Sequence, residues 1–186
     1  YTLVARRSSP TFYTALIRPV KNSITDSIEA TLQGPSAALL KGILLGQRQQ
    51  LPDELLNTFS TIGLTHILAV SGLHVGLIAL ITITCFSVLR VPRAAATTAT
   101  IGVLILYACI TNMTSSVVRA SIMASLFLIG QRLERQTDAI NILATAGLII
   151  LIIWPSALFD LSFQLSFIAT LIIITGYPKL KSLLPE

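Results

Sequence analysis

From residue 66 to residue 176 the chain consists of five long apolar segments with short polar connections between them. A helix that crosses the hydrocarbon core of a bilayer needs about 20 apolar residues, within a range of about 17–25. Only 11% of the residues are charged, whereas an average soluble domain has about 25%. We therefore predict an all-α, polytopic membrane helical bundle with about five transmembrane helices. The segments are 66–89, 94–112, 116–131, 139–154 and 158–176, and whether the short third and fourth cross fully stays open.

Residues 1–60 are amphipathic and too polar to span. An apolar stripe at four-residue spacing predicts one amphipathic helix. We expect two more short helices, one from Pro35 to about Gly46 and one that begins near Pro52. These helices would lie along the membrane surface or pack on the bundle, and the periodicity leaves both arrangements open. The stripe consists of Val20, Ile24, Ile28 and Leu32.

The connections between the apolar segments alternate between basic and uncharged. Arg90–Arg93, Arg132–Arg135 and the C-terminus are basic, and the connections between them carry no charge. Because basic connections stay on the cytoplasmic side, this alternation predicts a multi-pass protein of the cytoplasmic (inner) membrane. Residues 1–60 would form an extracytoplasmic or interfacial segment. Residues 61–180 would form the membrane domain, and residues 181–186 a short cytoplasmic tail.

Polar and ionisable residues gather in the outer half of the predicted bundle. Such groups are costly inside a membrane, so they are candidates for function. Arg119 would reach the lipid headgroups, pair with Asp160, or face an anionic solute. Asp160 and Gln164 are four residues apart and would share one helix face. The predicted polar cluster is His66, Ser71, His74, Arg119, Asp160 and Gln164.

Two alternative chemistries stay open for the same residues. Ser71 and His74 are three residues apart on the predicted helix, so they would serve as nucleophile and base in an intramembrane hydrolase. A metal site built from His66, His74 and Asp160 is the other alternative. We assign no catalytic residue, no metal ligand and no cofactor, and a small-solute transporter remains a rival function.

Four motifs then point to a family. The stretch Gly63-Leu-Thr-His-Ile-Leu-Ala-Val-Ser-Gly-Leu-His-Val-Gly76 resembles the signature of the ComEC-type competence proteins, which are inner-membrane DNA uptake channels of naturally transformable bacteria. Three other stretches resemble further elements of that family in the same order, and the resemblance covers roughly residues 35 to 176. These stretches are Gly42–Arg48, Ser115–Ala120 and Phe159–Ser166.

The resemblance implies transport of one DNA strand across the cytoplasmic membrane by part of a longer protein. The implied partners are single-stranded DNA, membrane lipid, other competence-machinery proteins and further copies of the chain. The family's metallo-β-lactamase-like domain has a His-x-His-x-Asp-His cluster, which a chain with two histidines lacks, so we expect no nuclease activity here. No nucleotide-binding loop occurs either. The repeat of Phe159, Phe163 and Phe167 favours helix packing or lipid contact over base stacking.

Overall fold

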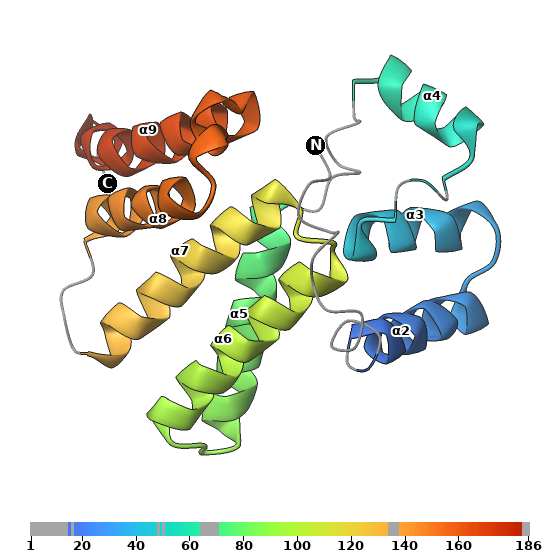
Figure 1. The fold of residues 1–186 in the computed structure, drawn as a ribbon, viewed down its shortest axis with the longest axis horizontal. Helices are drawn as coiled ribbons and strands as arrows, with labels where there is room; N and C mark the ends of the chain where they lie inside the picture. The colour runs from blue at the N-terminus through green and yellow to red at the C-terminus, as the bar shows by residue number, and fades with distance from the viewer. Residues whose placement is uncertain are drawn as a thin grey trace.

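The computed structural model describes residues 17–47, 51–63, 71–133 and 138–183, together with Ala15 and Gln49, and it describes side chains as far as Tyr177. All the regular elements in these ranges are helices, as predicted (Figure 1). They are α2 (Arg18–Thr31), α3 (Pro35–Leu45), α4 (Asp53–Thr61), α5 (Gly72–Val88), α6 (Arg93–Ile110), α7 (Ser115–Arg132), α8 (Ala139–Ile153), the 3₁₀ helix η4 (Pro155–Phe159) and α9 (Leu161–Leu183).

Helices α5, α6 and α7 form a three-helix bundle in which each helix contacts the other two. Val75, Leu104 and Val117 come from the three different helices and are fully buried against one another. The turns between the helices are short, so α5 and α6 are antiparallel, and so are α6 and α7 (Figure 1). The beginnings of α5 and α7 and the end of α6 therefore lie at one end of the bundle.

Helices α8 and α9 form a second pair beside α7. The Asp138 side chain caps α8 by accepting a hydrogen bond from the Ile140 backbone N–H at 2.9 Å. Phe163 is buried and stacks on Phe167 with 4.3 Å between the ring centroids, as the packing interpretation of the Phe repeat predicts. Phe159 lies outside this repeat because it belongs to η4 and is 85% exposed. In Figure 1, α8 and α9 run across the direction of α5 and α6.

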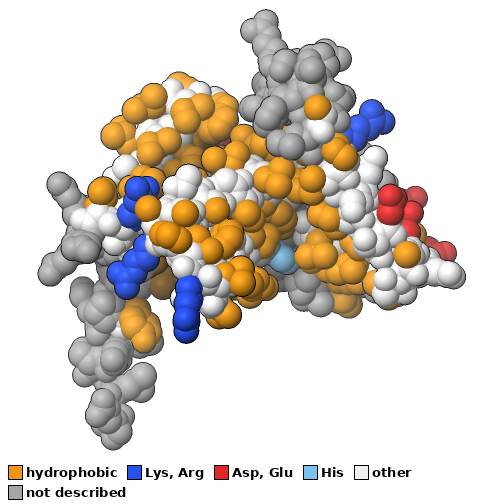
Figure 2. Space-filling view, turned by 90° about the horizontal axis from the view of Figure 1, so that it is seen from below, with side chains coloured by type: hydrophobic (Ala, Val, Ile, Leu, Met, Phe, Trp, Pro, Cys, Tyr) orange, Lys and Arg blue, Asp and Glu red, His pale blue; other side chains and the backbone are white. Residues whose placement is uncertain are grey.

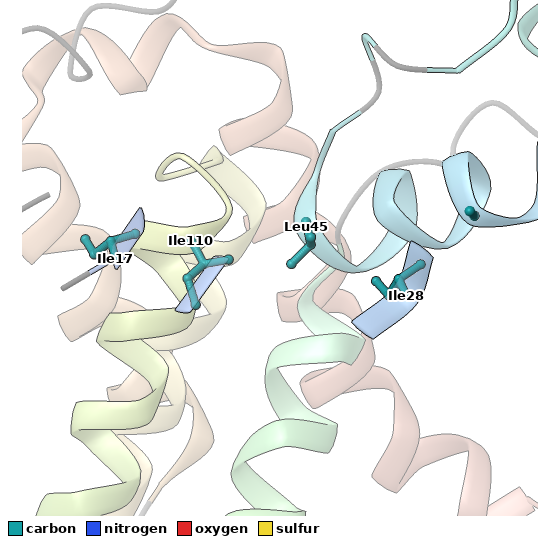
Figure 3. Packing of buried hydrophobic residues seen from close by; sticks show 5 residues of the cluster. Ile17, Ile28, Leu45 and Ile110 are labelled. Carbon is teal, nitrogen blue, oxygen red and sulfur yellow. The ribbon is translucent and has the colours of Figure 1, made fainter. Parts of the chain in front are cut away.

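The N-terminal helices pack on the bundle. The predicted stripe of α2 is confirmed, since Ile28 is buried and Val20, Ile24 and Leu32 pack around it. This stripe meets Leu45 of α3 and Ile110 at the end of α6, which joins the two parts of the chain in one apolar cluster (Figure 3). Lys41 of α3 also forms an ion pair with Glu29 of α2 at 2.7 Å. Of the two arrangements left open for these helices, packing on the bundle is therefore present.

The helix lengths bear on the prediction of five membrane spans. Within the described ranges, α6 is the one helix that is both long and apolar enough to cross a membrane, with a mean hydropathy of 1.6. The apolar helices Gly72–Val88, Ala139–Ile153 and Leu161–Tyr177 are slightly shorter than this criterion requires. The first predicted span began at residue 66, but Ser71 is extended and precedes α5. Residues 64–70 lie outside the described residues, so the five-span arrangement stays a prediction.

Large apolar side chains cover much of the outer surface (Figure 2). Leu73 and Val88, at the two ends of α5, are 80% and 77% exposed. Large contiguous apolar patches are rare on monomeric soluble proteins and mark surfaces that contact lipid or other proteins. In Figure 2 several Lys and Arg side chains lie on the left part of the molecule, a further one lies at the upper right, and the Asp and Glu side chains lie at the right end.

Gly147 offers a test of the contact between α8 and α9. A Cβ atom at this position would lie 3.1 Å from Cε1 of Phe167. We expect Gly147→Ala to lower the melting temperature of the purified protein, because overpacking costs about 1–3 kcal/mol and outweighs the gain of about 1 kcal/mol in helix propensity. The matched control is Gly102→Ala in α6, where no atom lies within 4 Å. A melting temperature that rises equally in both variants would contradict this packing.

Candidate functional site

Ser71 and His74 form a local polar pair at the beginning of α5. Ser71 is the N-cap residue, and its backbone N–H donates to Nδ1 of His74 at 3.3 Å. The Ser71 Oγ lies 3.0 Å from the same nitrogen. Nδ1 is therefore an acceptor, and the imidazole takes the place that a Glu or Gln side chain has in a capping box. The same geometry would let His74 accept the Ser71 hydroxyl proton, as a base paired with a nucleophile does.

Helix α7 lies directly beside this pair. A Cβ atom added to Gly72 would lie 3.3 Å from Cβ of Ala120, so the two backbones approach closely there. The lack of a side chain at Gly72 permits this approach. The face of α7 that carries Val117, Ala120 and Ala124 packs against the α5 and α6 cluster.

Arg119 lies on a different face of α7 and is 6% exposed. Its guanidinium group donates from Nη1 to Oγ of Ser115 at 2.6 Å and from Nη2 to Oγ of Ser162 in α9 at 3.1 Å. Its Nε is buried and has no hydrogen-bond partner among the described residues. The same holds for Oγ1 of Thr114 and Oγ of Ser121. The beginning of α7 thus has more buried hydrogen-bonding capacity than the described side chains satisfy.

Asp160, Ser162 and Gln164 together fix the beginning of α9. The Asp160 carboxylate accepts the backbone N–H of Ser162 at 3.0 Å, which makes Asp160 the N-cap of the helix. The Gln164 side-chain amide donates to the Leu158 carbonyl in η4 at 2.8 Å. Asp160 precedes the helix, and its backbone carbonyl accepts the Gln164 N–H at 3.1 Å, which is the four-residue spacing expected for the pair. Their side chains each bind a backbone group. All three residues are exposed, and Ser162 contacts α7 through the Arg119 guanidinium.

The predicted partnership of Arg119 and Asp160 takes an indirect form. No ion pair joins the two side chains in the described part of the chain, where Lys41 and Glu29 form the ion pair. The Ser162 residue connects them, because its hydroxyl accepts from Arg119 and its N–H donates to Asp160. The Asp160 carboxylate therefore accepts a hydrogen bond from the α9 backbone and forms no direct contact with Arg119.

The predicted cluster is divided by α7. Successive helix residues are about 100° apart, so Ala120 faces α5 while Arg119 faces α9. The Ser71 and His74 pair thus lies on one side of α7, and the group of Arg119, Asp160 and Gln164 lies on the other. His66 falls outside the described residues. Among the described residues no group of three or more His, Cys, Asp and Glu side chains could hold a metal ion.

Sequence reasoning missed two partners of Arg119. Ser115 is four residues before Arg119 on the same helix, a spacing that predicts contact and could have identified it. Ser162 is 43 residues away along the chain, and only the packing of α9 on α7 brings it to the guanidinium. Both hydroxyls accept from the cation without neutralising it.

Comparisons with known proteins agree with the sequence motifs. Residues 43–186 match the family described as Competence protein. ComE operon protein 3 of Bacillus subtilis (strain 168) is 26% identical over 166 residues, which are 89% of this chain and 21% of that protein. An uncharacterized protein of Aquifex aeolicus (strain VF5) is 33% identical over 127 residues, which are 68% of this chain and 30% of that protein.

The chain therefore spans less than a third of the length of either relative. No solved structure matches the chain. The family match includes α5 to α9 and with them all the described residues of the candidate site. It covers well over half of the sequence, and on this ground the chain belongs to the competence protein family.

Proposed function

We propose that this chain forms part of a path along which one strand of DNA crosses the cytoplasmic membrane. The observation that carries the proposal is Arg119, a buried cation at the beginning of α7 whose described hydrogen bonds go to neutral hydroxyls. A phosphodiester would supply the negative charge that these hydroxyls lack. Membership of the competence family supports DNA as the source of that phosphate.

The proposed topology places α5 to α9 across the membrane, with α8 and α9 inclined to α5 and α6 (Figure 1). The exposed apolar side chains would face lipid, and the shorter helices would use flanking residues or local thinning of the bilayer. Arg90 and Arg93 join α5 to α6, and Arg132 ends α7 at the same end of the bundle. By the positive-inside rule this end would be cytoplasmic. The beginnings of α5, α7 and α9 and the N-terminal helices would then lie outside.

This orientation would suit the entry of a polyanion. A helix N-terminus has a partial positive charge, and α5, α7 and α9 would all begin on the outer side. Arg119 would contact the phosphate, Asp160 and Gln164 would hold the beginning of α9, and Ser71 and His74 would line the neighbouring surface. His66 stays a predicted member of this group. The remaining wall would come from the rest of the protein, other competence proteins or further copies of the chain.

Loss of the charge at Arg119 tests the path. We expect Arg119→Gln to reduce the transformation frequency at least about tenfold and to leave DNA binding at the cell surface unchanged, because a charge-assisted hydrogen bond contributes about 1.5–3 kcal/mol. The control, Arg132→Gln, removes the same charge from the exposed other end of α7 and should transform normally. Normal transformation by the Arg119 variant would remove this residue from the path. An equal loss of transformation in both variants would mean that the net charge of the protein, and not the position of Arg119, causes the effect.

The orientation can be tested with single cysteines at exposed positions of the two ends. Met113 precedes α7 and Arg93 begins α6, so they mark opposite ends of α6. In a background without the native cysteines, an impermeant thiol reagent should label Met113→Cys in intact cells and should label Arg93→Cys only after the cells are lysed. Labelling in the reverse pattern would invert the topology.

An intramembrane hydrolase is the second candidate function, and the contact of 3.0 Å between Ser71 Oγ and His74 Nδ1 is the observation that favours it. Loss of a nucleophile abolishes turnover, whereas loss of a capping hydroxyl costs about 0.5–2 kcal/mol of stability. We expect Ser71→Ala to keep DNA uptake and to lower the melting temperature slightly, because Ser71 caps α5. Complete loss of uptake by a variant that is present in the membrane at the normal level would instead support the hydrolase.

A further inference from the structure

We infer that the hydrogen bond between Arg119 and Ser162 is a clasp that closes the seam between α7 and α9, and that a phosphodiester opens the clasp by taking the guanidinium group. The inference rests on the proposed function for the identity of that phosphodiester as part of a DNA strand. The inference adds a closed resting state to the proposed function. That state ends when Arg119 exchanges its hydrogen bond to Ser162 for one to a phosphate.

The guanidinium group is held by weak acceptors. It has five N–H donors, of which one goes to Ser115 in its own helix and one to Ser162 in α9, while the Nε donor is unpaired among the described residues. Both acceptors are neutral hydroxyls. A phosphate oxygen accepts a charge-assisted bond roughly twice as strong and can receive two parallel N–H donors from one guanidinium. A phosphodiester at the seam therefore outcompetes Ser162, while the bond to Ser115 can persist.

The beginning of α9 is tied to η4 by hydrogen bonds, and α9 is packed against α8. The Ser162 N–H is fixed to the Asp160 carboxylate, and Gln164 ties the same helix start to η4 through the Leu158 carbonyl. Phe167 of α9 fits against Gly147, so α9 is also packed closely on α8. When Ser162 is released, η4 and the beginning of α9 can therefore move relative to α7, while α8 keeps its own packing against α7.

The α7 side of the clasp is anchored separately. Val117 is fully buried in the α5–α7 cluster, and Ala120 packs against Gly72 of α5. These residues face away from α9, so exchange of the Arg119 partner leaves the three-helix bundle intact.

The experiment measures the seam in the full-length protein reconstituted in lipid vesicles. Spin labels are placed at Met113→Cys, before α7, and at Phe159→Cys, before α9, after Cys85 and Cys109 have been replaced by Ala. The distance between the labels is recorded in phosphatidylcholine vesicles, in vesicles that contain phosphatidylglycerol, and after addition of single-stranded oligothymidylate. We expect a short distance in both lipid mixtures and a shift to longer distances with the oligonucleotide.

Variants of Ser162 separate the clasp from its ligand. Ser162→Ala should show the longer distance between the labels without DNA. Ser162→Asp should form an ion pair with Arg119, so the distance should stay short with DNA and the cells should transform poorly. Ser162→Thr keeps the hydroxyl and should behave as the unaltered protein. A short distance in Ser162→Ala without DNA overturns the clasp itself.

Other results would show that DNA is not the ligand that opens the clasp. A longer distance in phosphatidylglycerol alone, with no further change on adding DNA, would identify a lipid headgroup as the ligand and overturn the strand as the opener. If Ser162→Ala opens the seam, oligothymidylate changes no variant, and Arg119→Gln cells transform normally, the clasp stands and the proposed DNA path fails.

Discussion

Apolar surface without a covering layer is the constraint on which the rest of the structure depends. Leu73 and Val88 at the ends of α5 and Phe159 before α9 are almost fully exposed, and water would make that exposure costly. Lipid removes this cost but provides no hydrogen bonds, so the polar groups must be satisfied within the protein. The caps at Ser71, Asp138 and Asp160 do this at the beginnings of α5, α8 and α9. Polar side chains are therefore found at the beginnings of these helices.

Much of the fold could be predicted from the sequence, because apolar periodicity and capping residues are local signals. The stripe through Val20, Ile24 and Ile28 and the acidic first turn of α4 appear where their spacing predicts them. The first membrane segment was predicted to begin at residue 66. Helix α5 begins after its N-cap Ser71, and residues 64–70 lie outside the described residues, so the start of that segment stays a prediction. The inclination of α8 and α9 to α5 and α6 was beyond prediction, because it depends on packing between helices and not on a local pattern (Figure 1).

The candidate site was predicted in composition but only partly in arrangement. Residue type identifies Arg119 and Asp160 as costly groups in an apolar chain, and charge alone predicts that they attract each other. The position of Ser162 between Arg119 and Asp160 depends on the register of α9 against α7, which no local pattern specifies. The separation of Ser71 and His74 from Arg119 has the same origin, since it depends on which face of α7 meets α5. Within the described residues, the site is therefore two polar groups beside different faces of one helix.

The central claim is that the DNA strand passes along the seam between α7 and α9. The most direct measurement replaces Ser162 with a photo-crosslinking amino acid in the full-length protein and illuminates cells during uptake of labelled DNA. A crosslink to single-stranded DNA at position 162, and none from the outward-facing position Ile172 in the same helix, is the predicted result. Crosslinking at neither position, or equally at both, while transformation proceeds normally would contradict the account.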